Sequence, residues 1–269
     1  MTGFSEWTRA SAASSIEIPT KSDDKYSRGV LGVITGSDQY PGAAVLGVEA
    51  ALKTGVGMVR YLGPDRASDL VLRQRPEAVT VPGRVAAWLV GSGMPSSQGD
   101  LGAVTEALGQ GVPVVLDAGA MNLYPRSTGP AVITPHYREL ALLLSVDPEP
   151  IARDPGHWAL RASRELGVTV LLKGNTTFVA GPEIALKVSN APTWLATAGA
   201  GDALAGILGA LVATHAKAAL DDPTELASLA ATATLIHSAA AAVASGGGPL
   251  TIMELCARVP ETIAALLAR

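Results

Sequence analysis

From Val30 onward, short β-branched or aliphatic runs alternate with helical patterns, and this alternation restricts the fold more than any other feature of the chain. It is typical of βαβ units, and therefore of a mostly parallel sheet covered by helices. The predicted strands are residues 30–35, 56–62, 88–90, 114–116, 132–134 and 168–172, followed by a hairpin formed by residues 177–180 and 184–188. The predicted helices between the early strands are residues 43–53, 101–108, 138–144 and 158–166.

The composition favours a single large α/β domain. The 269 residues are 48% hydrophobic and only 16% charged, so much of the chain must be interior. No linker rich in proline, glycine or serine divides the chain after Lys25, and no internal repeat is evident. We therefore expect a loose amino-terminal arm over residues 1–24 and one domain over residues 25–269.

Charge and cysteine usage narrow the partners. The net charge of −4 gives no basic surface for nucleic acid or an anionic membrane. The single cysteine, Cys256, excludes an internal disulfide, and residues 1–20 lack the apolar block of a signal peptide. Residues 227–244 carry no charged side chain but are mostly Ala, Thr and Ser, which favours a buried helix, capped near Asp222, over a membrane span. We expect a cytoplasmic protein with no nucleic-acid and no membrane partner.

Glycine and polar residues follow five of the predicted strands. They occupy residues 36–42, 91–94, 117–122, 134–136 and 173–177. In open α/β sheets, ligands bind at the carboxyl ends of the strands. The sequence therefore predicts that five separate loops converge on one rim of the sheet.

The stretch Thr197-Ala198-Gly199-Ala200-Gly201-Asp202 runs directly into an apolar helix over residues 203–213. The first turn of a helix has unpartnered N–H groups and the positive end of the peptide dipole. Glycines at 199 and 201 leave room for a phosphate to reach those donors. Asp202 could then take a proton from a hydroxyl group that attacks the phosphate, or it could simply cap the helix.

Two other strand ends carry candidate ligand contacts. Lys173 follows an apolar strand and could meet phosphate or ribose, although a lone lysine there is usually solvated. The donors that follow it, Gly174 to Thr177, make a nucleotide role the better interpretation. His136 opens a helical pattern, where histidine is usually bonded to its own backbone, and Glu139 could be its capping partner.

Several site classes do not match. Leu204 occupies the third glycine position of a dinucleotide fingerprint, and no phosphate-loop motif occurs. The histidines lack the spacing of a zinc site, so any metal should be Mg²⁺ held mainly by nucleotide phosphates, with no metal-binding residue of the protein assigned. Asp117 ends a buried strand, so its charge needs a partner such as a lysine, a backbone N–H or metal-bound water.

Together, these motifs resemble the NAD(P)H-hydrate dehydratase family, a branch of the ribokinase-like superfamily. The resemblance is carried by Tyr40-Pro41-Gly42-Ala43-Ala44 after Gly36, residues 50–57, Thr134-Pro135-His136, Lys173-Gly174 and residues 196–206. It extends from about Lys25 to the carboxyl terminus and matches the stand-alone form of the domain. It implies a ribokinase-like three-layer α/β/α sandwich with a mostly parallel central sheet, often assembled as a homotetramer.

The resemblance also implies roles for individual residues. Nucleotide contacts are expected from the loop and the helix start, that is from Lys173, Gly174, Asn175, Thr176, Thr177, Gly199, Ala200 and Gly201. The substrate pocket is expected to include Ala43, Gly93, His136 and Asp202, with Asp202 as the catalytic base. The chain departs from the family pattern at Tyr137-Arg138, at Ser92 in place of a usual proline, and at Gly119 in place of a frequent aspartate.

The implied reaction is repair of hydrated NADH or NADPH with ADP or ATP as co-substrate and Mg²⁺. Asp202 would deprotonate the C6 hydroxyl, the terminal phosphate would be transferred to it, and phosphate would then be eliminated. One alternative is a ribokinase-family kinase that phosphorylates a thiazole or pyrimidine alcohol. A second is a protein that binds nucleotide without turning it over.

Overall fold

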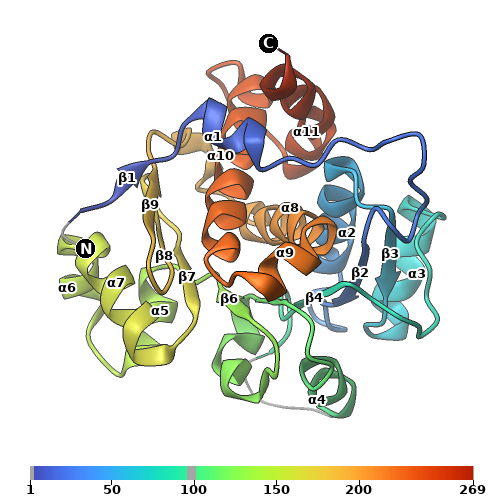
Figure 1. Cartoon of the computed structure of the whole chain (residues 1–269), viewed down its shortest axis with the longest axis horizontal. Coiled ribbons are helices and arrows are strands. Elements are labelled where there is room, and N and C mark those ends of the chain that lie inside the picture. Colours follow the sequence, from blue (N-terminus) through green and yellow to red (C-terminus); the bar gives the residue numbers. More distant parts are fainter. Residues whose placement is uncertain (1–2, 96–100, 269) are drawn as a thin grey trace.

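The computed structural model describes residues 3–95 and 101–268, and its centre is one nine-stranded sheet. The strands lie in the order β1-β9-β8-β7-β6-β5-β4-β2-β3, from the left of Figure 1 to the right. Their bounds are β1 (Ser5–Glu6), β2 (Val30–Ile34), β3 (Met58–Tyr61), β4 (Ala87–Val90), β5 (Val114–Leu116), β6 (Ala131–Ile133), β7 (Thr169–Leu172), β8 (Thr177–Ala180) and β9 (Ala185–Val188). All neighbours are parallel except β8, which is antiparallel to both β7 and β9.

Helices cover both faces of this sheet. One face carries α1 (Arg9–Ser14), α2 (Gly42–Thr54), α3 (Asp65–Gln74), α8 (Ala200–Thr214), α9 (Ala216–Asp221), α10 (Glu225–Ser245) and α11 (Ile252–Leu267). The other carries α4 (Gly102–Leu108), η1 (Ala118–Arg126), α5 (Tyr137–Leu144), α6 (Pro148–Arg153) and α7 (Pro155–Leu166). Successive strand residues alternate between two cores, as Leu31 and Val33 do against Val30 and Ile34. The predicted three-layer α/β/α sandwich is confirmed.

Helix α8 is the central helix of its layer. Residues 203–213 are all buried, as the apolar pattern predicted. Helices α2 and α8 pack closely because glycines face each other: a Cβ on Gly206 would lie 2.2 Å from the carbonyl oxygen of Gly47. This packing holds the amino end of α8 at a fixed place beside the sheet.

The expectation of a loose arm is wrong for residues 5–14. Strand β1 adds a parallel edge to β9, and the indole N–H of Trp7 donates to the hydroxyl of Thr232 on α10 at 3.0 Å. Helix α1 packs against α10 and α11, and Ala12 is fully buried. Trp7 and helix α1 find these contacts on α10 and α11, more than two hundred residues along the chain, so no local pattern could show that the segment is anchored.

The apolar run near residue 230 forms α10, which begins at Glu225 with Thr224 as its N-cap residue, two positions after the predicted Asp222. Within the described residues it is the one helix that could cross a membrane by length and composition, and 72% of its most apolar window is buried inside the fold. Helix α10, near the middle of Figure 1, packs against α8, α11 and strands β7 to β9, so it is a core helix.

Candidate active site

Four neighbouring parallel strands bring four polar residues to one rim. Strands β4, β5, β6 and β7 are adjacent in the sheet, and their carboxyl ends lead into Ser92, Asp117, Thr134 and Lys173. Because the strands are parallel, these ends lie side by side, as the sequence predicted. The amino end of α8 approaches the same rim, since a Cβ on Gly201 would lie 3.4 Å from the Lys173 ammonium nitrogen.

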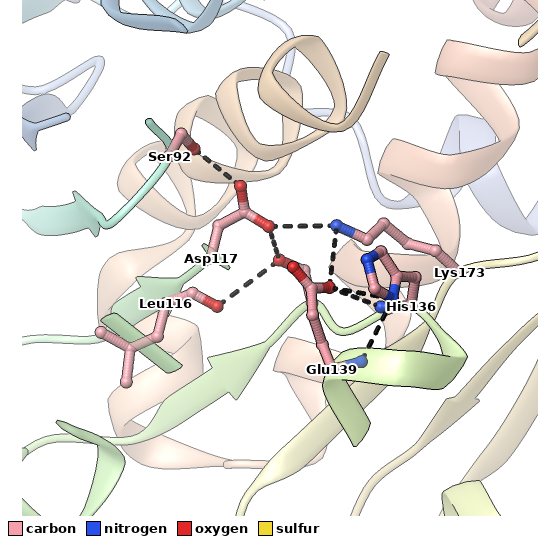
Figure 2. Close-up of polar contacts among 7 residues, drawn as sticks. Ser92, Leu116, Asp117, His136, Glu139 and Lys173 are labelled. Atoms are coloured by element: carbon pink, nitrogen blue, oxygen red, sulfur yellow. Dashed lines mark hydrogen bonds and ion pairs between the residues drawn. The ribbon is translucent and has the colours of Figure 1, made fainter. Parts of the chain in front are cut away.

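Asp117 is the buried centre of this rim. Its side chain is 3% exposed and accepts hydrogen bonds from the Ser92 hydroxyl at 2.8 Å, the Thr134 hydroxyl at 2.6 Å and the Lys173 ammonium group at 3.2 Å. Figure 2 shows the carboxylate between Ser92 and Lys173. Burial alone would raise the pKa of Asp117, but Lys173 and the two hydroxyl donors outweigh it and lower the pKa. The residue is therefore a carboxylate at neutral pH.

Lys173 is held between two carboxylates. Its ammonium nitrogen lies 3.2 Å from Asp117 and 3.9 Å from Glu139, and 22% of its side chain is exposed. Burial would lower the pKa of Lys173, but Asp117 and Glu139 reverse the effect and raise it. The lysine is charged and remains partly open to the rim.

His136 is positioned by the first turn of α5. Its Nδ1 accepts from the Glu139 backbone N–H at 3.2 Å, and the Glu139 carboxylate accepts from the His136 backbone N–H at 2.8 Å. This reciprocal capping box confirms the local roles predicted for both residues. Half of the histidine side chain stays exposed beside the rim, and the Lys173 backbone N–H donates to the Pro135 carbonyl at 2.8 Å.

Asp202 lies in the first turn of α8. Gly199, the N-cap residue, has a φ of +91°, a conformation that favours glycine, and it begins the helix directly before Ala200 and Gly201. Desolvation raises the pKa of Asp202 to about 6, with the charge of Asp117 adding to the rise and Lys173 opposing it. A carboxylate with this pKa is a stronger base than an ordinary surface aspartate and is still mostly ionised at neutral pH.

The predicted substrate residues Ala43 and Gly93 lie against each other. Gly93 has a φ of +69°, and a Cβ placed on it would lie 2.5 Å from the Ala43 side chain. A side chain at position 93 would therefore collide with Ala43, and this close contact places the start of α2 next to the loop after β4.

The predicted nucleotide loop, Lys173 to Thr177, links β7 to β8. Asn175 is tied to Ala191 by a side-chain bond of 2.8 Å and a backbone bond of 3.1 Å, and the Thr177 hydroxyl turns back to the Gly174 carbonyl. Thr176 is half-buried between them. The hydroxyl of Tyr137 abuts this loop: a Cβ on Gly174 would lie 2.6 Å from it. The departure at Tyr137 therefore falls on the loop expected to bind nucleotide.

A buried histidine lies behind the start of α8. His237 on α10 is 5% exposed, and its Nε2 has no hydrogen-bond partner among the described residues. Burial lowers the pKa of His237 to about 4, so the ring is neutral, and the nearby charge of Lys173 acts in the same direction. Over residues 3–95 and 101–268, no three His, Cys, Asp or Glu side chains gather as a metal site.

The sequence predicts roles for Asp202, Lys173 and His136, but it does not assign Asp117, Ser92 or Thr134 to the site. The one available signal was that Asp117 ends a buried strand and needs a partner. Ser92 stands where the family resemblance expects proline, and here its hydroxyl supplies a bond to Asp117 that proline could not make. At Gly119 a side chain would be crowded, since a Cβ would lie 2.4 Å from the Met94 carbonyl.

The sheet order, the two helical layers and the helix start at the strand rim define a three-layer α/β/α domain with a mostly parallel sheet. The crystal structure of the ADP/ATP-dependent NAD(P)H-hydrate dehydratase from Bacillus subtilis, co-crystallized with ATP and Mg²⁺, superposes with a TM-score of 0.88. The match covers 99% of this chain and 100% of that one at 24% identity. This likeness confirms the predicted fold.

Sequence comparison gives the family. A model described as NAD(P)H-hydrate dehydratase matches residues 31–255. The chain is 32% identical over 230 residues to the ADP-dependent (S)-NAD(P)H-hydrate dehydratase of Xanthomonas campestris, covering 76% of this chain and 79% of that protein. It is 40% identical over 214 residues to the bifunctional NAD(P)H-hydrate repair enzyme of Mycobacterium tuberculosis, covering 73% of this chain. The chain belongs to the NAD(P)H-hydrate dehydratase family, as its motifs predicted.

The match to the bifunctional relatives is partial. The chain spans about half the length of these proteins, 43% of the Mycobacterium tuberculosis enzyme and 53% of the one from Mycobacterium leprae.

Proposed function

We propose that this chain dehydrates hydrated NADH or NADPH at the expense of ADP or ATP. The observation that carries the proposal is the placement of Asp202 in the first turn of α8, next to the Lys173 ammonium group, in a member of the dehydratase family. The arrangement offers a base, a cation and a helix amino end at one place. Those are the groups that phosphoryl transfer to a hydroxyl requires.

The nucleotide is held by its phosphates at the start of α8. The first turn of α8, around Gly199, Ala200 and Gly201, offers the positive end of the helix dipole, and Lys173 adds a positive charge beside it. The loop from Gly174 to Thr177 continues along the rest of the nucleotide. Ala43, Gly93 and His136 line the side where the hydrated ring binds.

Asp202 removes the proton from the C6 hydroxyl of the hydrated ring as the oxygen attacks the terminal phosphorus. The new O–P bond forms while the bond to the bridging oxygen of the nucleotide breaks, so that ADP leaves as AMP or ATP leaves as ADP. The C6–O bond then breaks, phosphate departs, and loss of a proton from C5 restores the C5–C6 double bond. The protein's part is to hold the base, the hydroxyl and the phosphorus in line.

The protein's donor set fits Mg²⁺ that is bound mainly through phosphate oxygens and water. Asp117, the most buried carboxylate of the rim, already accepts from three donors, and no cluster of further ligands occurs among the described residues. When bound, the ion neutralises charge that develops on the phosphates. We further propose that the protein acts in the cytoplasm, where its one cysteine, a buried thiol, would stay reduced. The family resemblance carries the further proposal of a homotetramer.

One experiment tests the activity and separates its rivals. Hydrated NADH and hydrated NADPH are each supplied with ADP or ATP and Mg²⁺, and reduced-nicotinamide absorbance and free phosphate are followed together. The proposal requires both to rise in equal amounts. A stable phosphate ester formed from a thiazole or pyrimidine alcohol would favour a kinase. Binding of ADP without turnover of any substrate would indicate a nucleotide-binding protein.

A further inference from the structure

Asp117 has no direct part in the proposed chemistry, yet it is the best-connected side chain of the rim. Burying a carboxylate is costly unless it is paired and fully hydrogen-bonded. Asp117 meets this condition with donors from three other strand ends, namely Ser92 after β4, Thr134 after β6 and Lys173 after β7. Such an arrangement connects four adjacent strands through one charge.

We propose that Asp117 is a positioning residue, which fixes the Lys173 ammonium group at the start of α8 and sets the pH at which Asp202 becomes a base. The role of Asp202 as a base rests on the proposed function. The argument that Asp117 positions Lys173 rests on the contacts of Asp117 and does not depend on the proposed function.

The positioning follows from how both carboxylate oxygens are held. The Ser92 hydroxyl binds Oδ2, and the Thr134 hydroxyl binds Oδ1, the same oxygen that accepts from Lys173. The carboxylate therefore cannot turn away, and the lysine has a fixed acceptor. A free lysine side chain loses rotamer entropy when it binds a phosphate. In this site much of that ordering is present before the nucleotide arrives.

The charge argument concerns the groups that face Asp202. Asp117 at the end of β5 and Lys173 at the end of β7 act on it with opposite sign. Glu139 on α5 acts on the same lysine, while His237 on α10 is neutral. By pairing with Lys173, Asp117 keeps the lysine from forming a salt bridge with Asp202. A base engaged in such a bridge would be weaker and would compete with the phosphate for the lysine.

The test uses two readouts that do not need the hydrated substrate. Aspartate labelled with ¹³C at the carboxyl is titrated by NMR, with the Asp202 signal assigned from Asp202→Asn, and ADP binding is measured by calorimetry at pH 7.5. The variant is Asp117→Asn, which removes the charge and keeps the shape. Ser92→Ala removes one donor but leaves the charge. Glu49→Gln, a buried ion-paired acid between α2 and α3, is the matched control.

In Asp117→Asn we expect the titration midpoint of Asp202 to fall by about one pH unit, and ADP to bind about 10-fold more weakly. Ser92→Ala and Glu49→Gln should leave the Asp202 midpoint within about 0.3 unit of the wild type. A folded Asp117→Asn variant with unchanged midpoint and unchanged ADP binding overturns the proposal. A shift in the midpoint alone rejects the positioning role, and a loss of ADP binding alone rejects the effect on Asp202.

If Asp117→Asn does not fold, the double variant Ser92→Ala/Thr134→Val decides the positioning role. It frees the carboxylate from both hydroxyl groups and keeps its charge, so ADP should bind at least about 3-fold more weakly. Unchanged ADP binding rejects the proposal. A wild-type protein that shows these effects but never restores hydrated NADH would reject the proposed function and leave the inference standing.

Discussion

Two buried ion pairs of nearly equal burial lie in different parts of this molecule. Glu49 of α2 pairs with Arg75 at the end of α3, with side chains 3% and 24% exposed. Asp117 pairs with Lys173 at the strand rim, with side chains 3% and 22% exposed. Burial of a charged pair therefore does not by itself distinguish a functional site from a structural contact.

The pairs differ in what is left over once each is formed. The Arg75 guanidinium binds both oxygens of Glu49, and the pair faces Cys256, whose pKa is raised to about 12 by burial and by Glu49. A buried thiol with so high a pKa is inert. Each cation also faces a second carboxylate, Glu77 at 3.7 Å from Arg75 and Glu139 at 3.9 Å from Lys173, but of the two it is Lys173 that lies beside the glycine at the start of α8. A pair that keeps unused donors next to a helix amino end is suited to bind an anion.

The largest predicted effect separates the two regions by activity. Asp202→Asn should lower kcat about 10²–10⁴-fold, because the hydroxyl loses its base while the nucleotide site is kept. Stopped-flow assay of hydrated NADH repair measures the rate, and calorimetry with ADP checks that binding persists. Substantial turnover by the variant would show that Asp202 is not the base. The strand rim would then no longer differ from the Glu49–Arg75 region by its part in catalysis.

The second prediction concerns the structural pair. Glu49→Ala removes the carboxylate that binds the Arg75 guanidinium through both oxygens and leaves it only the more exposed Glu77, so we expect the free energy of unfolding to fall by about 3 kcal/mol. Urea unfolding at pH 7 measures the loss. Turnover per folded molecule should match the wild type at a temperature where both are folded. A drop in kcat there would mean that the α2–α3 pair also supports the site, and the comparison would fail.

A third prediction follows from the sign of the pKa shift at Asp202. The folded-state pKa is raised from 3.8 to about 6, so between these values the folded protein keeps a proton that the unfolded chain releases. Stability therefore falls as pH rises through this window and stays lower above it. Asp202→Asn removes the effect and should be roughly 2 kcal/mol more stable at pH 8, with no gain below pH 4.

Thermal unfolding of both proteins from pH 3 to pH 8 measures this difference. Equal stability of Asp202→Asn and wild type at pH 8 would show that Asp202 is better solvated than its place in the first turn of α8 indicates.

The sequence predicted much of the sheet because its strands are buried on both faces. Residues 114–116 form β5 as predicted, and the strand predicted at 168–172 is β7 at Thr169–Leu172. Apolar β-branched runs of that kind leave little choice of structure. Helix α11 was not predicted, and Pro260 lies inside it. Strand β1 and helix α1 were missed because their stability comes from β9, α10 and α11, far along the chain.

The site also contains residues that the sequence could predict and residues that it could not. Asp202 and Lys173 belong to local motifs rich in glycine or hydrogen-bond donors, so their roles could be predicted from the sequence alone. The partners of Asp117 depend on the order of strands in the sheet. Because β5 lies between β4 and β6, Ser92 and Thr134 lie on either side of Asp117 and each donates to one of its carboxylate oxygens. Nothing in the spacing of residues 92, 117, 134 and 173 specifies that order.

The smallest predicted effect tests whether a phosphate approaches the unused side of the rim pair. Gly201→Ala places a methyl group 3.4 Å from the Lys173 ammonium nitrogen, an ordinary contact that the fold can accept. Alanine favours a helix over glycine by up to about 1 kcal/mol, so stability should not fall. ADP should nevertheless bind about 5-fold more weakly, because the methyl stands in front of the backbone donors.

Gly109→Ala is the matched control, since its Cβ would also lie 3.4 Å from its nearest neighbour, outside the rim. If calorimetry shows equal ADP affinity for Gly201→Ala and Gly109→Ala, the nucleotide phosphates do not reach the start of α8, and the unused donors of Lys173 need another explanation.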